Sequence, residues 1–272
     1  MSLSHDAIRQ RLGEASARLQ ELEIFGEIES TNSYLMQRSG PPPGQVRVAA
    51  TDNQTAGRGR HGRTWQSPPG SGLCLSLSYS FASQPRHLSA LTLSVGLAVI
   101  NALKEQEVEG VQLKWPNDLI AMDSKLGGIL TEAQSRAGGA VSVVTGIGLN
   151  LDLSNYRGLE LDRNQARPVI DVKSHADFVP DINALTSSVI RAVSQLLVDY
   201  ETSGFEQFRD QWQQHDWLCG RALTIQIAQR QMAGVGAGVA DDGALLVDTP
   251  EAGLQRITSG TVIAGDMARV IS

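Results

Sequence analysis

Cysteine and long apolar runs are both scarce in this chain of 272 residues. Only Cys74 and Cys219 occur, each flanked by apolar residues, so there is no disulfide framework and no cysteine-based metal site. We expect both to be buried free thiols in a reducing cytoplasm. The longest apolar run, residues 91–103, is shorter than the roughly 20 residues that span a bilayer, and the charged N-terminus does not read as a signal peptide. The sequence therefore predicts a soluble, cytoplasmic protein with no membrane partner.

Positive charge is also in the minority. There are 23 Lys and Arg against 29 Asp and Glu, a formal net charge of -6. A nucleic-acid-binding surface normally needs an excess of cations, so we expect no nucleic-acid partner for this chain.

The hydrophobic share of 41% is enough for a core, and the length allows one large domain or a main domain with a small one.

The periodicity of apolar residues predicts an α+β region followed by an all-β region. Helices are expected over residues 5–22, 32–38 (capped by Ser30 or Thr31), 88–106, 181–200 and 204–217. Strands are expected over 45–50, 72–81 (half-buried), 111–115, 125–133 and 140–150, with an irregular stretch at 152–180. From Gly220 onward, short strands alternate with Asp-Gly and Gly-rich turns, which is typical of a small antiparallel barrel. The predicted domains are residues 1–218 and 219–272.

The segment GRGRHGRT, residues 57–64, differs from a phosphate-binding P-loop by one residue, with Arg63 where lysine is expected. A P-loop leads into a helix, but Pro68 and Pro69 follow too closely for a helix to begin here. What remains is a flexible loop that lets backbone approach a ligand, with guanidinium groups that suit phosphate or carboxylate. On an acidic protein, this loop indicates a small anionic ligand.

Three further segments carry polar groups at the ends of apolar strands. KWPNDL (114–119) places Asp118 at a strand-to-turn junction, although Asn-Asp after proline is often only a turn. KLGGIL (125–130) has Lys125 before two strand glycines, and TGIGLN (145–150) has glycines and a terminal amide. Glycine weakens a strand unless something approaches the backbone closely, so both segments suit a ligand pocket.

Taken together, these segments resemble the biotin protein ligase family, which includes the biotin repressor. The matching pieces are ESTN (29–32), QTAGRGRHGRTW (54–65), KWPNDL, KLGGIL and GIGLN (146–150), in the family's order over about 120 residues. The resemblance implies a mixed β-sheet catalytic domain flanked by helices, similar to the class II aminoacyl-tRNA synthetases, and a small C-terminal SH3-like barrel.

The resemblance also implies a two-step reaction. Biotin and ATP, with Mg²⁺, form biotinyl-5′-AMP and pyrophosphate, and a lysine of the biotin carboxyl carrier protein domain of acetyl-CoA carboxylase then attacks the mixed anhydride. The implied catalytic residues are Lys125, Arg60 and Asp118, the last to steer the metal or the incoming lysine. The implied biotin-binding residues are Ser30, Thr31, Asn32, Gln54, Arg58, Gly59, Arg60, Lys125, Gly127 and Gly128. The implied ATP and adenylate residues are Arg58, Arg60, Trp65, Lys125, Gly148 and Asn150, with Asn150 reading the adenine; metal ligands are not implied.

Elementary chemistry agrees with these roles. Adenylation brings a carboxylate against a phosphate, so fixed cations such as Arg60 and Lys125 must offset the repulsion. Biotin's ureido group needs a few convergent polar groups in an otherwise apolar pocket. The water-labile intermediate needs a lid, for which residues 57–65 are the candidate.

Two other functions stay open. A lipoate–protein ligase uses the same adenylation logic but would favour a more apolar pocket, and a catalytically silent biotin-binding protein would not need Lys125, Arg58 and Arg60 together. Fewer than 30 residues precede STN, so we expect a ligase without the N-terminal helix-turn-helix domain of bifunctional members, or a piece of a longer protein. A monomer and a homodimer are both compatible with the sequence.

Overall fold

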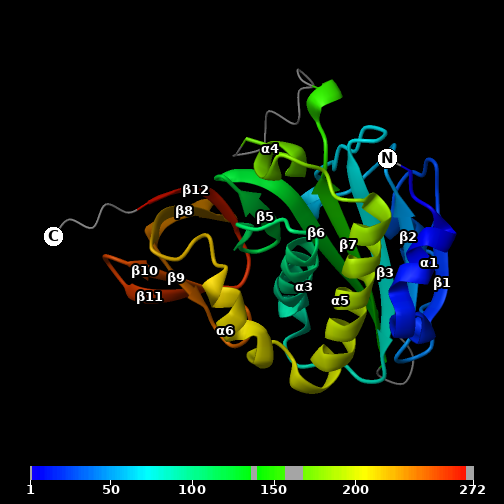
Figure 1. The fold of residues 1–272 in the computed structure, drawn as a ribbon. Coiled ribbons are helices and arrows are strands. Elements are labelled where there is room, and N and C mark those ends of the chain that lie inside the picture. The colour runs from blue at the N-terminus through cyan, green and yellow to red at the C-terminus, as the bar shows by residue number, and fades with distance from the viewer. Residues whose placement is uncertain (1, 136–139, 157–167, 268–272) are drawn as a thin grey trace.

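A mixed seven-stranded sheet forms the centre of the molecule (Figure 1). The computed structural model describes residues 2–135, 140–156 and 168–267. The strands, in chain order, are β1 Leu19–Ile24, β2 Val46–Thr51, β3 Gly72–Phe81, β4 Gln112–Lys114, β5 Asp118–Ala121, β6 Ser124–Ser135 and β7 Val141–Asn150. Their order in the sheet is β1-β2-β3-β7-β6-β5-β4; β1 and β2 are parallel and all other neighbours are antiparallel. The predicted mixed sheet is therefore confirmed.

Helices cover both faces of this sheet. On one face, α3 (Leu91–Glu105), α5 (Ile182–Ser203) and α1 (His5–Leu12) pack side by side over the main core, as Figure 1 shows. On the other face, α2 (Thr31–Met36) contacts β2, β3 and β7, and its Leu35 packs with Ala49 and Val144 in a separate small cluster. Consequently β3 is buried along its whole length, and the prediction of a half-buried strand was wrong. Two of its serines have side-chain partners: Ser76 bonds Thr31 and Asn32 of α2, and Ser80 bonds Ser142 of β7 at 2.9 Å.

The N-terminal helix is much shorter than its apolar spacing predicts. It ends at Leu12, because Gly13 adopts a positive φ of 55°, and a 3-10 turn over Gly13–Arg18 leads into β1. Leu19 and Leu22, predicted on a helix face, are instead buried strand residues aligned with β2. The sequence also does not predict β5, because KWPNDL has the pattern of a strand that ends in a turn.

The other helices agree better with prediction. α2 is capped by the Ser30 hydroxyl, which accepts from the Ser33 backbone N–H, and α5 is capped by Asp181. A short helix α4 (Val172–Ala176) lies within the stretch predicted to be irregular, whose residues 157–167 are outside the described ranges. α6 (Glu206–Gln214) is the predicted short aromatic helix.

The C-terminal region forms a second, all-antiparallel sheet. Its strands are β8 Arg221–Ile227, β9 Arg230–Val239, β10 Leu245–Thr249, β11 Gly253–Ile257 and β12 Thr261–Met267, in the order β11-β10-β9-β8-β12. The small β region is thus confirmed, whereas closure into a barrel and the exact domain boundary stay predictions.

The two cysteines differ in burial. Cys74 in β3 is buried as expected. Cys219, just before β8, is exposed, contrary to expectation, because Trp217 and Leu218 take the buried positions there.

The helical segment Leu88–Glu105 is long and apolar enough to cross a membrane by composition alone. In the folded chain 67% of it is buried, with α3 packed against α5 and β6. A place in the protein core therefore accounts for its apolar character.

The connection from α6 to the second sheet is hydrogen-bonded to β4. The Leu113 N–H donates to the His215 carbonyl at 2.8 Å, and the Trp217 N–H donates to the Leu113 carbonyl at 2.8 Å. Between them Asp216 is 7% exposed; one carboxyl oxygen accepts from the Leu218 N–H, and the other has no hydrogen-bond partner among the described residues. Burial raises the pKa of Asp216 to about 7.

We therefore predict that Asp216 makes the protein less stable as pH rises from about 4 to 8. The folded-state pKa of about 7 exceeds the ordinary 3.8, so the folded state binds the proton more tightly than the unfolded state. The stability that this proton contributes falls as pH rises above 3.8 and is lost once pH passes through 7. Asp216→Asn keeps the shape without the charge and should remove up to about 4 kcal/mol of this dependence, at about 1.4 kcal/mol per pKa unit. Urea unfolding at pH 4 and pH 8 measures it; equal pH dependence in both proteins would contradict the prediction.

Candidate active site

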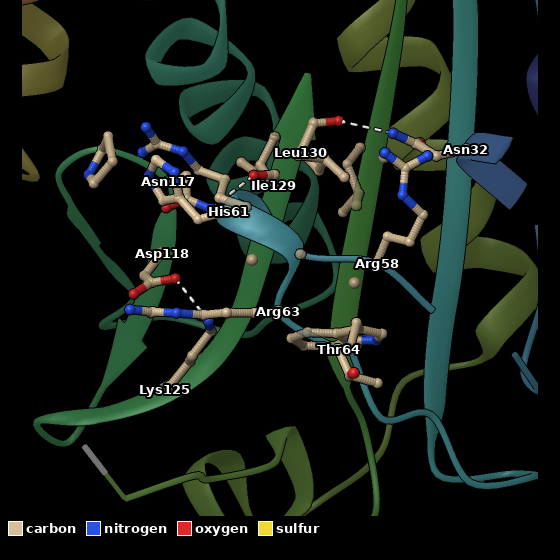
Figure 2. A pocket seen from close by; sticks show the side chains of 18 of the residues that line it. Asn32, Arg58, His61, Arg63, Thr64, Asn117, Asp118, Lys125, Ile129 and Leu130 are labelled. Atoms are coloured by element: carbon tan, nitrogen blue, oxygen red, sulfur yellow. Dashed lines mark hydrogen bonds and ion pairs between the residues drawn. The ribbon is translucent and has the colours of Figure 1, made fainter. Parts of the chain in front are cut away.

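One pocket gathers most of the residues singled out in the sequence (Figure 2). It lies over β6 and β7, between the start of α2, the loop of residues 57–65 (the Gly/Arg loop) and the β4–β5 turn. The expected site residues that line it are Ser30, Thr31, Asn32, Gln54, Arg58, Gly59, Arg60, Trp65, Asp118, Lys125, Gly128 and Gly148. Gly127 and Asn150 are absent from the lining. Segments more than 100 residues apart in the sequence thus meet at one place.

At one end of the pocket, buried hydroxyl and amide groups form a connected network, which we call the polar end. Gln54 Oε1 accepts from the Thr31 backbone N–H at 2.8 Å and from its hydroxyl at 3.1 Å. Thr31 Oγ1 lies 2.7 Å from Ser76 Oγ, and Ser76 donates to Asn32 Oδ1 at 2.7 Å. Ser76, which sequence reasoning missed, is fully buried in β3. This end offers several fixed donors and acceptors in an otherwise apolar environment.

Two glycines of β7 make room for neighbouring side chains. A Cβ at Gly146 would collide with the Asn32 side-chain amide, and a Cβ at Gly148 would lie 2.5 Å from the Trp65 ring. The TGIGLN glycines are therefore needed because Asn32 and Trp65 pack directly on the strand backbone. The expected close approach is made in this structure by side chains of the protein itself.

The Gly/Arg loop folds back on itself beside the sheet. The Gly59 N–H donates to the Arg63 carbonyl at 2.7 Å, and the Trp65 N–H donates to the Gly57 carbonyl at 2.9 Å. A short 3-10 turn over Arg60–Gly62 closes its tip, with His61 at a positive φ of 56°. No helix follows the loop, which confirms that it is not a P-loop.

Basic side chains surround a single aspartate at the other end, which we call the charged end. Lys125 Nζ lies 2.8 Å from Asp118 Oδ1, and Lys114 Nζ lies 3.9 Å from Asp118 Oδ2. Burial lowers the pKa of Arg60, and the nearby negative charge of Asp118 opposes that shift. Figure 2 shows Arg63 extending beside Asp118 and Lys125. Lys114 and Arg63 are cations of the motifs KWPNDL and QTAGRGRHGRTW, but the sequence alone predicts no role for either.

Trp65 connects the Gly/Arg loop to the charged end. Lys125 Nζ lies 5.8 Å from the centre of the Trp65 ring, within range of a cation–π contact. Since the ring also rests on Gly148, Trp65 forms a flat apolar wall beside Lys125. Such a wall suits an aromatic ligand group held next to an anionic one.

Three expected residues are placed differently from their expected roles. Arg58 does not face the charged end: its guanidinium lies 2.6 Å from the Glu132 carboxylate and 3.2 Å from the Ser33 hydroxyl. Asn150 does not face the pocket: its Nδ2 donates to the backbone carbonyl of Ile170 at 3.2 Å, which joins the end of β7 to the segment before α4. Gly127 lies beneath the pocket, where a Cβ would be 2.5 Å from the Gly148 carbonyl.

The second sheet also reaches the pocket. Gly260, Thr261 and Val262, at the start of β12, belong to the lining, and Lys114 Nζ is 3.5 Å from the Val262 carbonyl. The Trp115 indole donates to the Gly243 carbonyl at 3.0 Å. The sequence predicts the whole site within residues 1–218, because no motif marks the contribution of the second sheet.

Within the described residues, no group of three or more His, Cys, Asp or Glu side chains could hold a metal ion. Asp118 is the one carboxylate among the described pocket residues, and it is already paired with Lys125. A single carboxylate together with substrate phosphates is a common arrangement for Mg²⁺, so the residues present fit a magnesium ion that arrives with a nucleotide.

Comparison with known proteins agrees with this geometry. Residues 25–150 match the model of the biotin/lipoate A/B protein ligase family. The chain is 32% identical over 226 residues to the bifunctional ligase/repressor BirA of Escherichia coli K12, covering 83% of this chain and 68% of that protein. It is 28% identical to the biotin–[acetyl-CoA-carboxylase] ligase of Mycobacterium tuberculosis, covering 90% of each.

A solved structure extends the likeness to three dimensions. The biotin protein ligase from Aquifex aeolicus in complex with biotin and ATP matches with a TM-score of 0.71 at 25% identity, covering 89% of this chain and 97% of the other. The likeness therefore includes the second sheet as well as the first. With a pocket built from the matched motifs, this chain belongs to the biotin/lipoate A/B protein ligase family, among its biotin protein ligases.

Proposed function

We propose that this protein activates biotin with ATP to biotinyl-5′-AMP and transfers the biotinyl group to a lysine of a biotin carboxyl carrier protein. The observation that carries the proposal is the pocket's division into a buried polar end, built by Thr31, Asn32 and Gln54, and a charged end around Lys125. Biotin has the matching division, with a polar ureido ring at one end and a carboxylate at the other.

In the first step, the polar end holds the ureido ring and directs the carboxylate toward the charged end. Lys125 and Arg60 offset the charge of the carboxylate and the α-phosphate, so the carboxylate oxygen attacks phosphorus and pyrophosphate leaves. ATP supplies the adenylyl group, and Asp118 is the carboxylate that would hold the Mg²⁺ arriving with it. Trp65 and Gly148 form the wall for the adenine, and Asn150 shapes the neighbouring backbone.

In the second step, a neutral lysine amine of the carrier attacks the acyl carbon and AMP leaves. We infer that the carrier is the biotin carboxyl carrier domain of an acetyl-CoA carboxylase, because the name of the Mycobacterium tuberculosis relative gives acetyl-CoA carboxylase as its substrate. We place the protein in the cytoplasm, where this carrier and ATP occur. We also propose residues 1–218 as the catalytic domain and 219–272 as the small β domain that closes one side of the pocket.

Biotin-dependent ATP–pyrophosphate exchange tests the first step directly. Purified protein with biotin should exchange labelled pyrophosphate into ATP, and omission of biotin should abolish the exchange. A protein that binds biotin but catalyses no exchange would exclude the proposed enzyme. Parallel incorporation of labelled biotin and labelled lipoate into a carrier domain separates the two ligase classes; incorporation of lipoate alone would favour a lipoate–protein ligase.

The Gly/Arg loop is expected to act as a lid over the adenylate. Hydrogen–deuterium exchange across residues 57–65 should slow at least several-fold when biotinyl-AMP forms, because the bound anion offsets the roughly 1–2 kcal/mol per residue needed to order a loop. Exchange in α5 provides the internal reference. Unchanged exchange in the loop at saturating ligand would show that it is not a lid.

A further inference from the structure

Glu132 lies at the edge of the pocket and belongs to none of the matched motifs. It follows Gly128 and Leu130 at every second position of β6 and lines a hollow next to the pocket, together with Arg58 and Leu130. Its carboxylate accepts from Arg58 Nη2 at 2.6 Å and from Asn32 Nδ2 at 3.1 Å. One residue of the central sheet thus joins the Gly/Arg loop to the start of α2.

Through Asn32, this contact continues into the polar end. Asn32 accepts from the Ser76 hydroxyl, Ser76 accepts from the Thr31 hydroxyl, and the Thr31 backbone N–H donates to Gln54, each at 2.8 Å or less. Thr31, Asn32 and Ser76 are at most 4% exposed, so water does not compete for these bonds. The hydrogen bonds therefore run without a break from the polar end to Arg58.

Arg58 is placed to carry this connection to the loop. Figure 2 shows its side chain extending toward Asn32, whereas Arg63 extends toward Asp118. The side chain of Arg58 is 47% exposed and that of Glu132 is 21% exposed, so the pair is only moderately screened by solvent. Arg58 forms its ion pair with Glu132 and is not drawn into the charge cluster around Lys125.

We propose that Glu132 is a positioning residue: it fastens the Gly/Arg loop to the polar end through Arg58, so that the closed loop and a ligand held at the polar end stabilise each other. This inference rests on the proposed function, because the polar end has to bind the ureido group of biotin. When the ureido group takes up hydrogen bonds of Thr31 and Asn32, the Asn32 amide stays oriented toward Glu132. Glu132 in turn keeps Arg58 in place and the loop closed over the adenylate.

Glu132→Gln tests the proposal with little change in shape, since the glutamine oxygen still accepts from Asn32 while the charge facing Arg58 is lost. Without any ligand, hydrogen exchange in residues 57–65 should become about two- to fivefold faster, the range expected for a partly exposed ion pair. With biotin and ATP, biotinyl-AMP should be released faster by a similar factor, while the rate of adenylate formation changes less.

A double-mutant cycle separates this role from general destabilisation. Arg58→Gln alone should reproduce the faster loop exchange, and Glu132→Gln added to Arg58→Gln should have little further effect. Glu14→Gln, at an exposed position in the turn before β1, removes the same charge elsewhere and should leave loop exchange and adenylate release unchanged. A Tm within a few degrees of the unmodified protein shows that each variant folds.

The ligand-free exchange experiment also distinguishes this inference from the proposed function. If Glu132→Gln speeds loop exchange but the unmodified protein shows no biotin-dependent pyrophosphate exchange, the contact is supported and the proposed function fails. If pyrophosphate exchange is normal but Glu132→Gln leaves the loop and adenylate release unchanged, the inference is overturned. Fully additive effects of the two substitutions would overturn it as well.

Discussion

Lys125→Ala is expected to lower biotin-dependent ATP–pyrophosphate exchange at least about 100-fold. Lys125 is the cation closest to Asp118, at 2.8 Å, and it stands beside the Trp65 wall where we place the carboxylate and α-phosphate. Removal of one preorganised charge-stabilising donor from an active site typically costs about 100- to 1,000-fold in rate. Pyrophosphate exchange at saturating biotin and ATP measures the effect.

The fold should survive this change. Lys125 lies on the pocket surface rather than in the core, and Asp118 retains Lys114 at 3.9 Å. Arg191→Ala, which removes an ion pair with Glu105 on the helical side, is the matched control and should retain near-normal exchange. Near-normal exchange by Lys125→Ala itself would refute the role assigned to this lysine.

Gly148→Ala is expected to lower kcat/KM for ATP by about 10- to 100-fold with a much smaller effect on biotin binding. The added methyl group would lie 2.5 Å from the Trp65 indole, so the ring must move off β7 and away from Lys125. Displacement of a wall of the reacting site by about 1 Å can cost as much as 100-fold. Initial rates of pyrophosphate exchange at varied ATP and at varied biotin separate the two effects.

A second glycine provides the control. Gly26 precedes the site in the chain, and a methyl group there would meet no atom within 4 Å. Gly26→Ala should therefore leave both kinetic constants unchanged. Equal losses for ATP and biotin in Gly148→Ala would indicate general disruption of the pocket, and no loss at all would show that Trp65 does not line the adenine site.

Much of this arrangement could be derived from local sequence. Apolar residues predict α3 and α5, alternation in residues 45–50 predicts β2, and an apolar run bounded by turn residues at 140–150 predicts β7; the cap of α2, expected at Ser30 or Thr31, is Ser30. These elements are readable because their apolar periodicity is long or their capping residue acts locally. The motif glycines likewise predicted close contacts on β7, which Gly146 and Gly148 make.

Other features depend on contacts between distant segments. Nothing local shows that Leu19 and Leu22 belong to a strand, because leucine serves helices and strands alike and pairing with β2 decides between them. In the same way, β3 is buried on both faces only because α2 covers the second one. Secondary structure was least predictable where tertiary packing overrode local preference.

The sequence by itself determined which chemical groups this protein brings to its pocket: hydroxyls and amides, arginines, a lysine and an aspartate, in an order that identifies the family. The tertiary structure alone decided their partners. It turned Arg58 toward Glu132, Asn150 toward the backbone, and residues 260–262 into the pocket wall. The physical reason is that a motif specifies side-chain chemistry along a short stretch of chain, whereas an ion pair or a pocket wall depends on which strands the sheet places next to each other.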